Sequence, residues 1–213
     1  MNTSHSTDHN ISHNIGRIVR RTIGLTASVI LASSLAFAAQ TFRITGTQNL
    51  ATVQSDTTVE KFVGRTSKVT GEIRFDPTSK TGGGTITVDG ASIETGNTGR
   101  DESMRSTKWL NFDKSPQIRF EALKVSNTSG DQYTVVGKLS MSGKTRDVNA
   151  NATLRFLPAS EQTKKLGFQG DVINLRATLT IKLSEFGVVI PEFSKASVAD
   201  AQRIQINVFA SNK

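Results

Sequence analysis

Apolar and polar residues alternate with a period of two through most of the chain after about residue 40. In the segment 69–75, Val69, Ile73 and Phe75 fall on one face, and Glu72 and Arg74 fall on the other. This alternation is the pattern of a β-strand that buries one of its faces.

Later segments repeat the pattern at greater length. Residues 133–141 and 148–156 alternate on either side of a polar turn at residues 142–145, which predicts a hairpin. Residues 173–183 and 204–208 alternate as well, and residues 117–125 do so with a change of phase at Ala122 and Leu123 that is typical of a bulge. Residues 42–53 and 57–62 predict one or two further strands. The sequence therefore predicts an all-β fold of about eight antiparallel strands that close into a barrel or sandwich.

A few segments interrupt this rhythm. Gly82, Gly83 and Gly84 predict a tight or irregular connection before a strand at residues 85–89. Residues 98–112 carry Met104 and Phe112 at helical spacing, which predicts one short helix over an end of the barrel. Residues 157–170 are polar and predict a connection.

The first 38 residues predict a signal peptide. Arg17, Arg20 and Arg21 precede an apolar stretch at residues 23–35, which ends in the small residues of a cleavage pattern at positions 36–38. A membrane anchor is the alternative, but the apolar run is shorter than the ~20 residues that a spanning helix needs. We therefore expect residues 39–213 to be one mature domain, exported to the periplasm or secreted.

The composition argues against an enzyme. The chain has no cysteine, and its three histidines, His5, His9 and His13, all precede the predicted cleavage point. The mature domain would lack the commonest general base, nucleophile and metal ligands, so we expect no catalysis, no metal and no cofactor. Asp101 and Glu102 are adjacent acids that would point in different directions on a helix.

The excess of basic over acidic residues says little about binding partners. The net charge is +8, but it is dispersed and has no interleaved aromatic residues. This pattern argues against nucleic acid and leaves weak, transient contact with a membrane surface as the functional alternative to simple solubility.

Several short motifs occur in an order that resembles a known family. They are residues 71–77, 91–96, 100–106, 109–112, 116–120, 137–145 and 185–187. Their order is similar to that of the YceI-like lipid- and polyisoprenoid-binding family. The resemblance implies an extended lipocalin-like barrel, exported and frequently a homodimer, that encloses a long-chain polyisoprenoid or the tail of an isoprenoid quinone. The family often carries histidines at two places where this chain has none, one of them at Ser103, and this puts any headgroup contact through histidine in doubt.

A barrel that carries such a chain needs an interior lined with branched and aromatic side chains. The inward positions of the alternation supply the candidates: Phe75, Ile86, Val88, Ile93, Trp109, Phe112, Phe120, Val135, Leu139, Met141, Leu154, Leu179, Ile181, Phe186 and Ile206. The alternative is that these side chains simply fill a solid core, in which case the protein is a non-catalytic structural or interaction module.

Two arginines have two interpretations. Arg100 and Arg105 are expected near the barrel mouth, where a guanidinium could bind an oxygen-rich headgroup. Alternatively, an arginine and Asp101 form an ion pair that holds the helix on the barrel rim. Ser92 and Thr95 are expected to cap and turn the chain.

Overall fold

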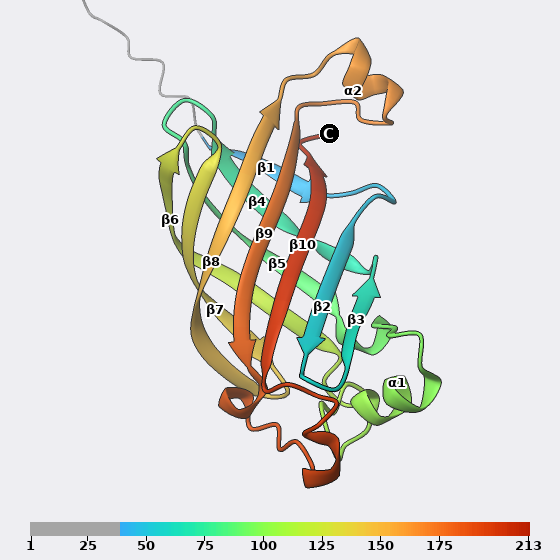
Figure 1. Ribbon diagram of the computed structural model, residues 1–213. Helices are drawn as coiled ribbons and strands as arrows, with labels where there is room; N and C mark the ends of the chain where they lie inside the picture. Colours follow the sequence, from blue (N-terminus) through green and yellow to red (C-terminus); the bar gives the residue numbers. More distant parts are fainter. Residues whose placement is uncertain (1–38) are drawn as a thin grey trace, which may run out of the picture. The chain divides into compact units, whose positions relative to one another are not determined.

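A computed structural model describes residues 39–213, which form a single antiparallel sheet rolled into a barrel (Figure 1). The predicted signal peptide lies outside these residues. The strands are β1 (Gln40–Ile44), β2 (Leu50–Asp56), β3 (Lys61–Thr66), β4 (Val69–Asp76), β5 (Thr81–Asp89), β6 (Gln117–Ser129), β7 (Gln132–Met141), β8 (Lys144–Leu157), β9 (Val172–Lys182) and β10 (Ala201–Ser211). The helices are η1 (Gly90–Ser92), α1 (Thr98–Arg105), α2 (Glu161–Lys165), η2 (Leu183–Phe186) and η3 (Glu192–Ser194).

Pairing between β1 and β10 closes the barrel. The ring runs β1-β4-β5-β6-β7-β8-β9-β10, and Arg43 and Ile44 of β1 then pair with Ser211 and Ala210 of β10. The remainder of the same β10 edge pairs with β2, which carries β3 as a hairpin. The predicted closed barrel of about eight antiparallel strands is confirmed.

The predicted alternation sets which side chains face inward. On β7, Tyr133, Gly137, Leu139 and Met141 are buried, whereas the alternate positions 132, 134, 136 and 138 are exposed. The change of phase in β6 is also confirmed, because the register with β7 shifts between Ala122 and Lys124.

The glycine triplet lies within β5, so the prediction that it forms a connection is wrong. The turn comes earlier, at residues 77–80, and Gly82, Gly83 and Gly84 pair with Phe75, Arg74 and Ile73 of β4. Gly84 has a φ of +155°, and a side chain there would collide with the carbonyl oxygen of Glu72. Glycine is therefore required inside this strand and does not mark its end.

The helix at residues 98–112 is shorter than predicted. The Asn97 side chain accepts a hydrogen bond from the Arg100 backbone N–H at the start of α1, and the helix ends at Arg105 because Ser106 adopts an extended conformation. Turns follow, and Asn111 has a φ of +58° that no helix allows. Helix α1 lies over one end of the barrel, as predicted (Figure 1).

Two other segments also differ from the expectation. Residues 40–66 supply three strands, and the predicted polar connection at residues 157–170 contains α2. A capping box between Ser160 and Thr163 begins this helix, a signal that was present in the sequence. Within residues 39–213, every helix is too short or too polar to span a bilayer.

Candidate functional site

A long, narrow cavity runs inside the barrel and is lined by residues from every strand between β2 and β10. The space between the lining side chains, including open solvent at its edge, is ≈ 1690 Å³, but the centre of a water molecule can reach only ≈ 170 Å³ of it. Tyr133 and Met141, near the two ends of β7, both line the cavity, so this small reachable volume is spread along a narrow bore. The bore suits a single extended chain better than a bulky, rounded molecule.

The cavity exists because small residues occupy several inward positions. Gly84 faces Ala122 across β5 and β6, and Ala152 faces Ala177 across β8 and β9; all four line the cavity. Large residues at these positions would fill the centre, as they do in most small barrels. The wall is otherwise apolar, and Thr52, Arg74, Arg100, Tyr133, Gln202 and the indole N–H of Trp109 are its polar exceptions.

One end of the cavity is closed by α1 and the turn after it. Met104, Leu110 and Phe112 are buried and contribute to the lining there. Trp109 lines the same end, and its Nε1 is buried without a hydrogen-bond partner among residues 39–213. This end therefore offers an apolar wall with one unused donor.

Arg100 holds this end together. Its guanidinium stacks on the Phe62 ring at 3.8 Å, Nη1 donates to Glu60 Oε1 at 2.6 Å, and Nε donates to Thr95 Oγ1 at 3.0 Å. The hydrogen bond from Arg100, followed by one from Ser197, holds the pKa of the Glu60 carboxyl below its usual value. The charge of Arg100 is thus already balanced by a neighbour.

The prediction that Asp101 forms an ion pair with an arginine at the barrel rim is wrong. Asp101 is buried and its Oδ1 accepts hydrogen bonds from the backbone N–H and the hydroxyl of Thr95, at 3.0 and 2.6 Å. The half-buried ion pair that ties the helix to the barrel rim does exist, but its acid is Glu60, from the turn between β2 and β3.

Comparison with protein families identifies the family to which this barrel belongs. The family model of the YceI-like domain matches residues 32–210. The chain belongs to the YceI-like family.

Individual relatives of this YceI-like domain are distant. A UPF0312 protein of Serratia proteamaculans is 33% identical over 103 residues, which is 48% of this chain and 50% of the relative. The aligned region thus spans about half the length of the curated relatives it matches.

Solved structures share the fold. BcnA of Burkholderia cenocepacia has a TM-score of 0.66 at 24% identity, with 79% of this chain and 99% of that chain covered. A polyisoprenoid-binding domain from Saccharophagus degradans has a TM-score of 0.59 at 13% identity, with 81% and 98% covered. At such identities these likenesses show the fold alone.

The structure brings most of the predicted lining residues of the YceI-like domain together around the cavity. Those that line it are Phe75, Ile86, Val88, Ile93, Arg100, Trp109, Phe112, Phe120, Val135, Leu139, Met141, Leu154, Leu179, Ile181 and Ile206.

Phe186 and Arg105 do not line the cavity. Phe186 belongs to η2, where the chain has left the strand alternation, and it is buried in the core next to the lining. Arg105 donates from Nη1 to the carbonyl oxygen of Ala91 at 3.2 Å, so it connects α1 to η1. Neither side chain is a cavity-wall residue in this structure.

Sequence reasoning also missed several lining residues. Phe62, Met104, Ile118 and Val198 line the cavity, and so do the small residues that make room in it. Ile118 shares the alternation with Phe120, so it was detectable. The glycines Gly82, Gly83 and Gly84 were not detectable, because a glycine carries no apolar signal.

The cavity wall carries few reactive side chains. Among residues 39–213, no group of three or more His, Cys, Asp or Glu side chains is placed to hold a metal ion. The one buried acid near the cavity, Asp101, is occupied by Thr95.

Proposed function

We propose that this chain binds one long-chain isoprenoid lipid, a polyprenyl chain or the tail of an isoprenoid quinone, inside the barrel, as a carrier or store. The observation that carries the proposal is the thin apolar cavity along the barrel interior. A cavity of this shape and polarity fits a branched hydrocarbon chain and excludes most polar metabolites.

The energetics favour such a ligand. Each CH₂ group removed from water contributes about 0.8 kcal/mol, so burying even half of a long prenyl chain supplies ample binding energy without polar contacts. The wall meets this need with branched and aromatic side chains such as Leu139, Leu179 and Ile181. Binding would be selective for chain shape more than for hydrogen-bonding groups.

Family membership supports the proposal. The chain belongs to the YceI-like family, and a structural neighbour from Saccharophagus degradans is described as a polyisoprenoid-binding domain. The rival function is a structural module with a solid core. The small lining residues Gly84, Ala122 and Ala177 argue against that rival.

The wider role is part of the same proposal. The absence of histidine and cysteine in residues 39–213 supports a non-catalytic role. Export, transient contact with a membrane surface and formation of a homodimer stay predictions from the sequence.

An uptake experiment with charged substitutions tests the proposal. Leu139→Arg places a cation in the cavity wall and should abolish uptake of a polyprenol by purified protein, because the charge would have to be desolvated beside the chain. Thr134→Arg, at an exposed position of the same strand, is the matched control and should take up polyprenol normally. Phe120→Arg is the second cavity variant, and circular dichroism shows which variants are folded. Normal uptake in a folded Leu139→Arg or Phe120→Arg protein would contradict the proposal.

A further inference from the structure

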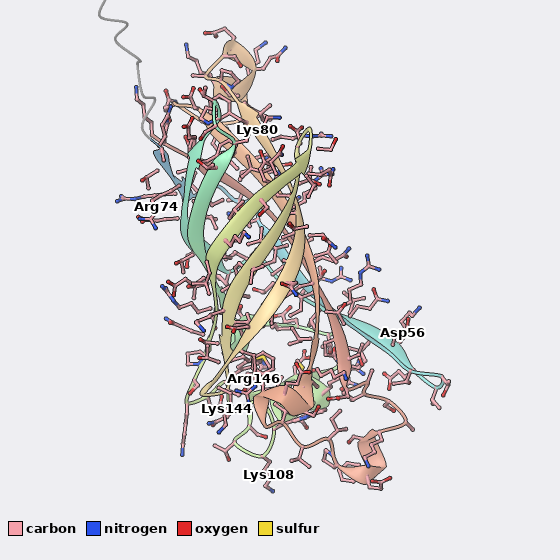
Figure 2. The ribbon with its side chains drawn as sticks, turned by 90° about the vertical axis from the view of Figure 1, so that its left-hand side faces the viewer. Asp56, Arg74, Lys80, Lys108, Lys144 and Arg146 are labelled. Carbon is pink, nitrogen blue, oxygen red and sulfur yellow. The ribbon has the colours of Figure 1, made fainter. Side chains whose placement is uncertain are left out.

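The barrel wall has a slit where β5 and β6 separate. The two strands pair from Gly84 to Asp89 on β5, but Thr81, Gly82 and Gly83 pair only with β4. Beyond Ala122, β6 follows β7 alone. Figure 2 looks onto this side of the barrel, where the strands diverge toward the turn that carries Lys80. The slit ends at that turn, because Lys80 Nζ donates to the Gly130 carbonyl oxygen at 3.0 Å.

The slit borders the cavity, because Gly82, Gly83 and Gly84 of this stretch of β5 all line it. Of all the residues that line the cavity, only Arg74 and Gly82 are exposed, and both border the slit. Gly83 follows Gly82 on β5 and pairs with Arg74 on β4. A Cβ added at Gly83 would meet only the Ala122 carbonyl oxygen, at 4.0 Å. At Gly82 and Gly83, therefore, no side chain of β5 covers the gap.

Arg74 stands at the rim of this slit. It is the register partner of Gly83, and its side chain points outward from the barrel (Figure 2). Within residues 39–213, no ion pair or side-chain hydrogen bond involves Arg74. The acids two positions away on β4 are occupied, since Glu72 accepts from Arg43 at 3.1 Å and Asp76 accepts from Ser79 at 2.7 Å.

The two arginines of the cavity wall therefore differ. Arg100 is closed in by α1 and its charge is balanced by Glu60, whereas Arg74 is exposed beside an opening and has no partner among the described residues. An unpaired guanidinium binds phosphate-like oxygens through charge-assisted hydrogen bonds.

We propose that the slit between β5 and β6 is a side portal of the cavity, and that Arg74 binds an anionic headgroup of the phosphate class on a chain whose tail lies inside. This inference rests on the proposed lipid-binding function. It assigns the polar end of the ligand to the β5–β6 wall and not to the end covered by α1.

Two probes of equal chain length test the portal: a polyprenol and the corresponding polyprenyl monophosphate. The chain has one tryptophan, Trp109, and it lines the cavity, so its fluorescence follows binding of both probes. The intact domain should bind the phosphate about 10-fold more tightly than the alcohol, as one charge-assisted contact predicts. Arg74→Gln should remove this preference by lowering the affinity for the phosphate about 10-fold. Arg119→Gln, an exposed arginine of the same wall, is the control and should keep the preference.

Substitutions that fill the slit test whether ligands enter the cavity through it. Gly83→Trp should slow uptake of both probes at least about 10-fold, whereas Thr87→Trp, on the same face of β5 where both neighbours are paired, should not. Gly83→Leu serves if the larger substitution fails to fold. Retention of the phosphate preference in Arg74→Gln would overturn the headgroup assignment, and normal uptake by a folded Gly83 variant would overturn the portal. If the intact domain bound neither probe, the proposed function itself would be wrong. If it bound both equally, only the headgroup assignment would be.

Discussion

The guanidinium carbon of Arg100 lies 3.8 Å from the centre of the Phe62 ring, and both residues line the cavity. The contact joins the start of α1 to β3, residues that are far apart in the sequence. Together with the Glu60 ion pair, it holds the helix over one end of the barrel.

Arg100→Gln is expected to weaken this closure. The substitution removes the cation–π contact and the ion pair, and the cation–π part alone corresponds to about 0.5–1 kcal/mol of the free energy of unfolding. Hydrogen exchange at the amides of α1 should accelerate more than exchange in the central strands β7 to β9. Equal acceleration in all these segments would show that the contact supports the whole barrel and not the helix locally.

The same ion pair predicts a pH dependence. Hydrogen bonds from Arg100 and Ser197 lower the pKa of Glu60 from its usual 4.5 in the folded protein. The contribution to stability is therefore present above that usual value and is lost as the pH falls through the lower folded pKa. Melting temperatures measured from about pH 6 to about pH 2 should fall less steeply for Glu60→Gln than for the natural chain. Parallel curves would contradict the assignment.

Most of the fold was predictable because the information is local. Alternation such as that of Tyr133, Leu139 and Met141 reports a buried strand face directly, and the turn at residues 142–145 sets a hairpin. The placement of β2 and β3 and the separation of β5 from β6 were not predictable, because they depend on register between strands distant in sequence. The glycine triplet was misplaced for the same reason: its cause is the close approach of the Glu72 carbonyl oxygen to Gly84, which no local pattern reveals.

The candidate site was predictable to a different degree. Inward aliphatic and aromatic residues followed from the alternation, and most of the residues predicted to line the cavity do line it. The ion-pair partner of Arg100 was not predictable, because Glu60 lies 40 positions away along the chain. Arg74 was assigned only to an outward face, since nothing in the sequence shows that the wall opens beside it.

A cavity-filling substitution should separate binding from stability. Ala177→Phe adds a ring where Ala177 faces Ala152, and we expect it to reduce polyprenol affinity at least about 10-fold while changing the free energy of unfolding by less than about 2 kcal/mol. Ala201→Phe, at the exposed start of β10, is the control for the added ring. A loss of stability without a loss of binding would show that the space at Ala177 is not where the chain lies.

Trp109 should report occupancy. Because the indole lines the cavity, a bound hydrocarbon chain replaces water near it, and the emission should shift to shorter wavelength and saturate at one ligand per protein. Trp109→Phe should bind the ligand without this signal, as a calorimetric titration can verify. An unchanged emission spectrum at saturating ligand would place the chain away from this end.

Tyr133, the one tyrosine of the chain, should titrate late. Burial, and then the charge of Asp131, raise its pKa above the usual 10.0. Its contribution to stability is present below that usual value and declines as the pH rises toward the higher folded pKa. Spectrophotometric titration of the tyrosinate should give a midpoint above that of the unfolded protein, and Tyr133→Phe should lose stability less steeply in alkaline solution. A midpoint equal to the unfolded value would mean that the hydroxyl reaches water.

The most direct test of the lipid-binding function is native mass spectrometry of residues 39–213, purified from a bacterial host without detergent, beside a denatured sample extracted with organic solvent. We predict one apolar adduct per chain, with the mass of a prenyl lipid, which disappears on denaturation and is recovered in the extract. A clean protein mass, with no adduct after incubation with polyprenols and isoprenoid quinones, would contradict the account and leave a barrel with a structural role.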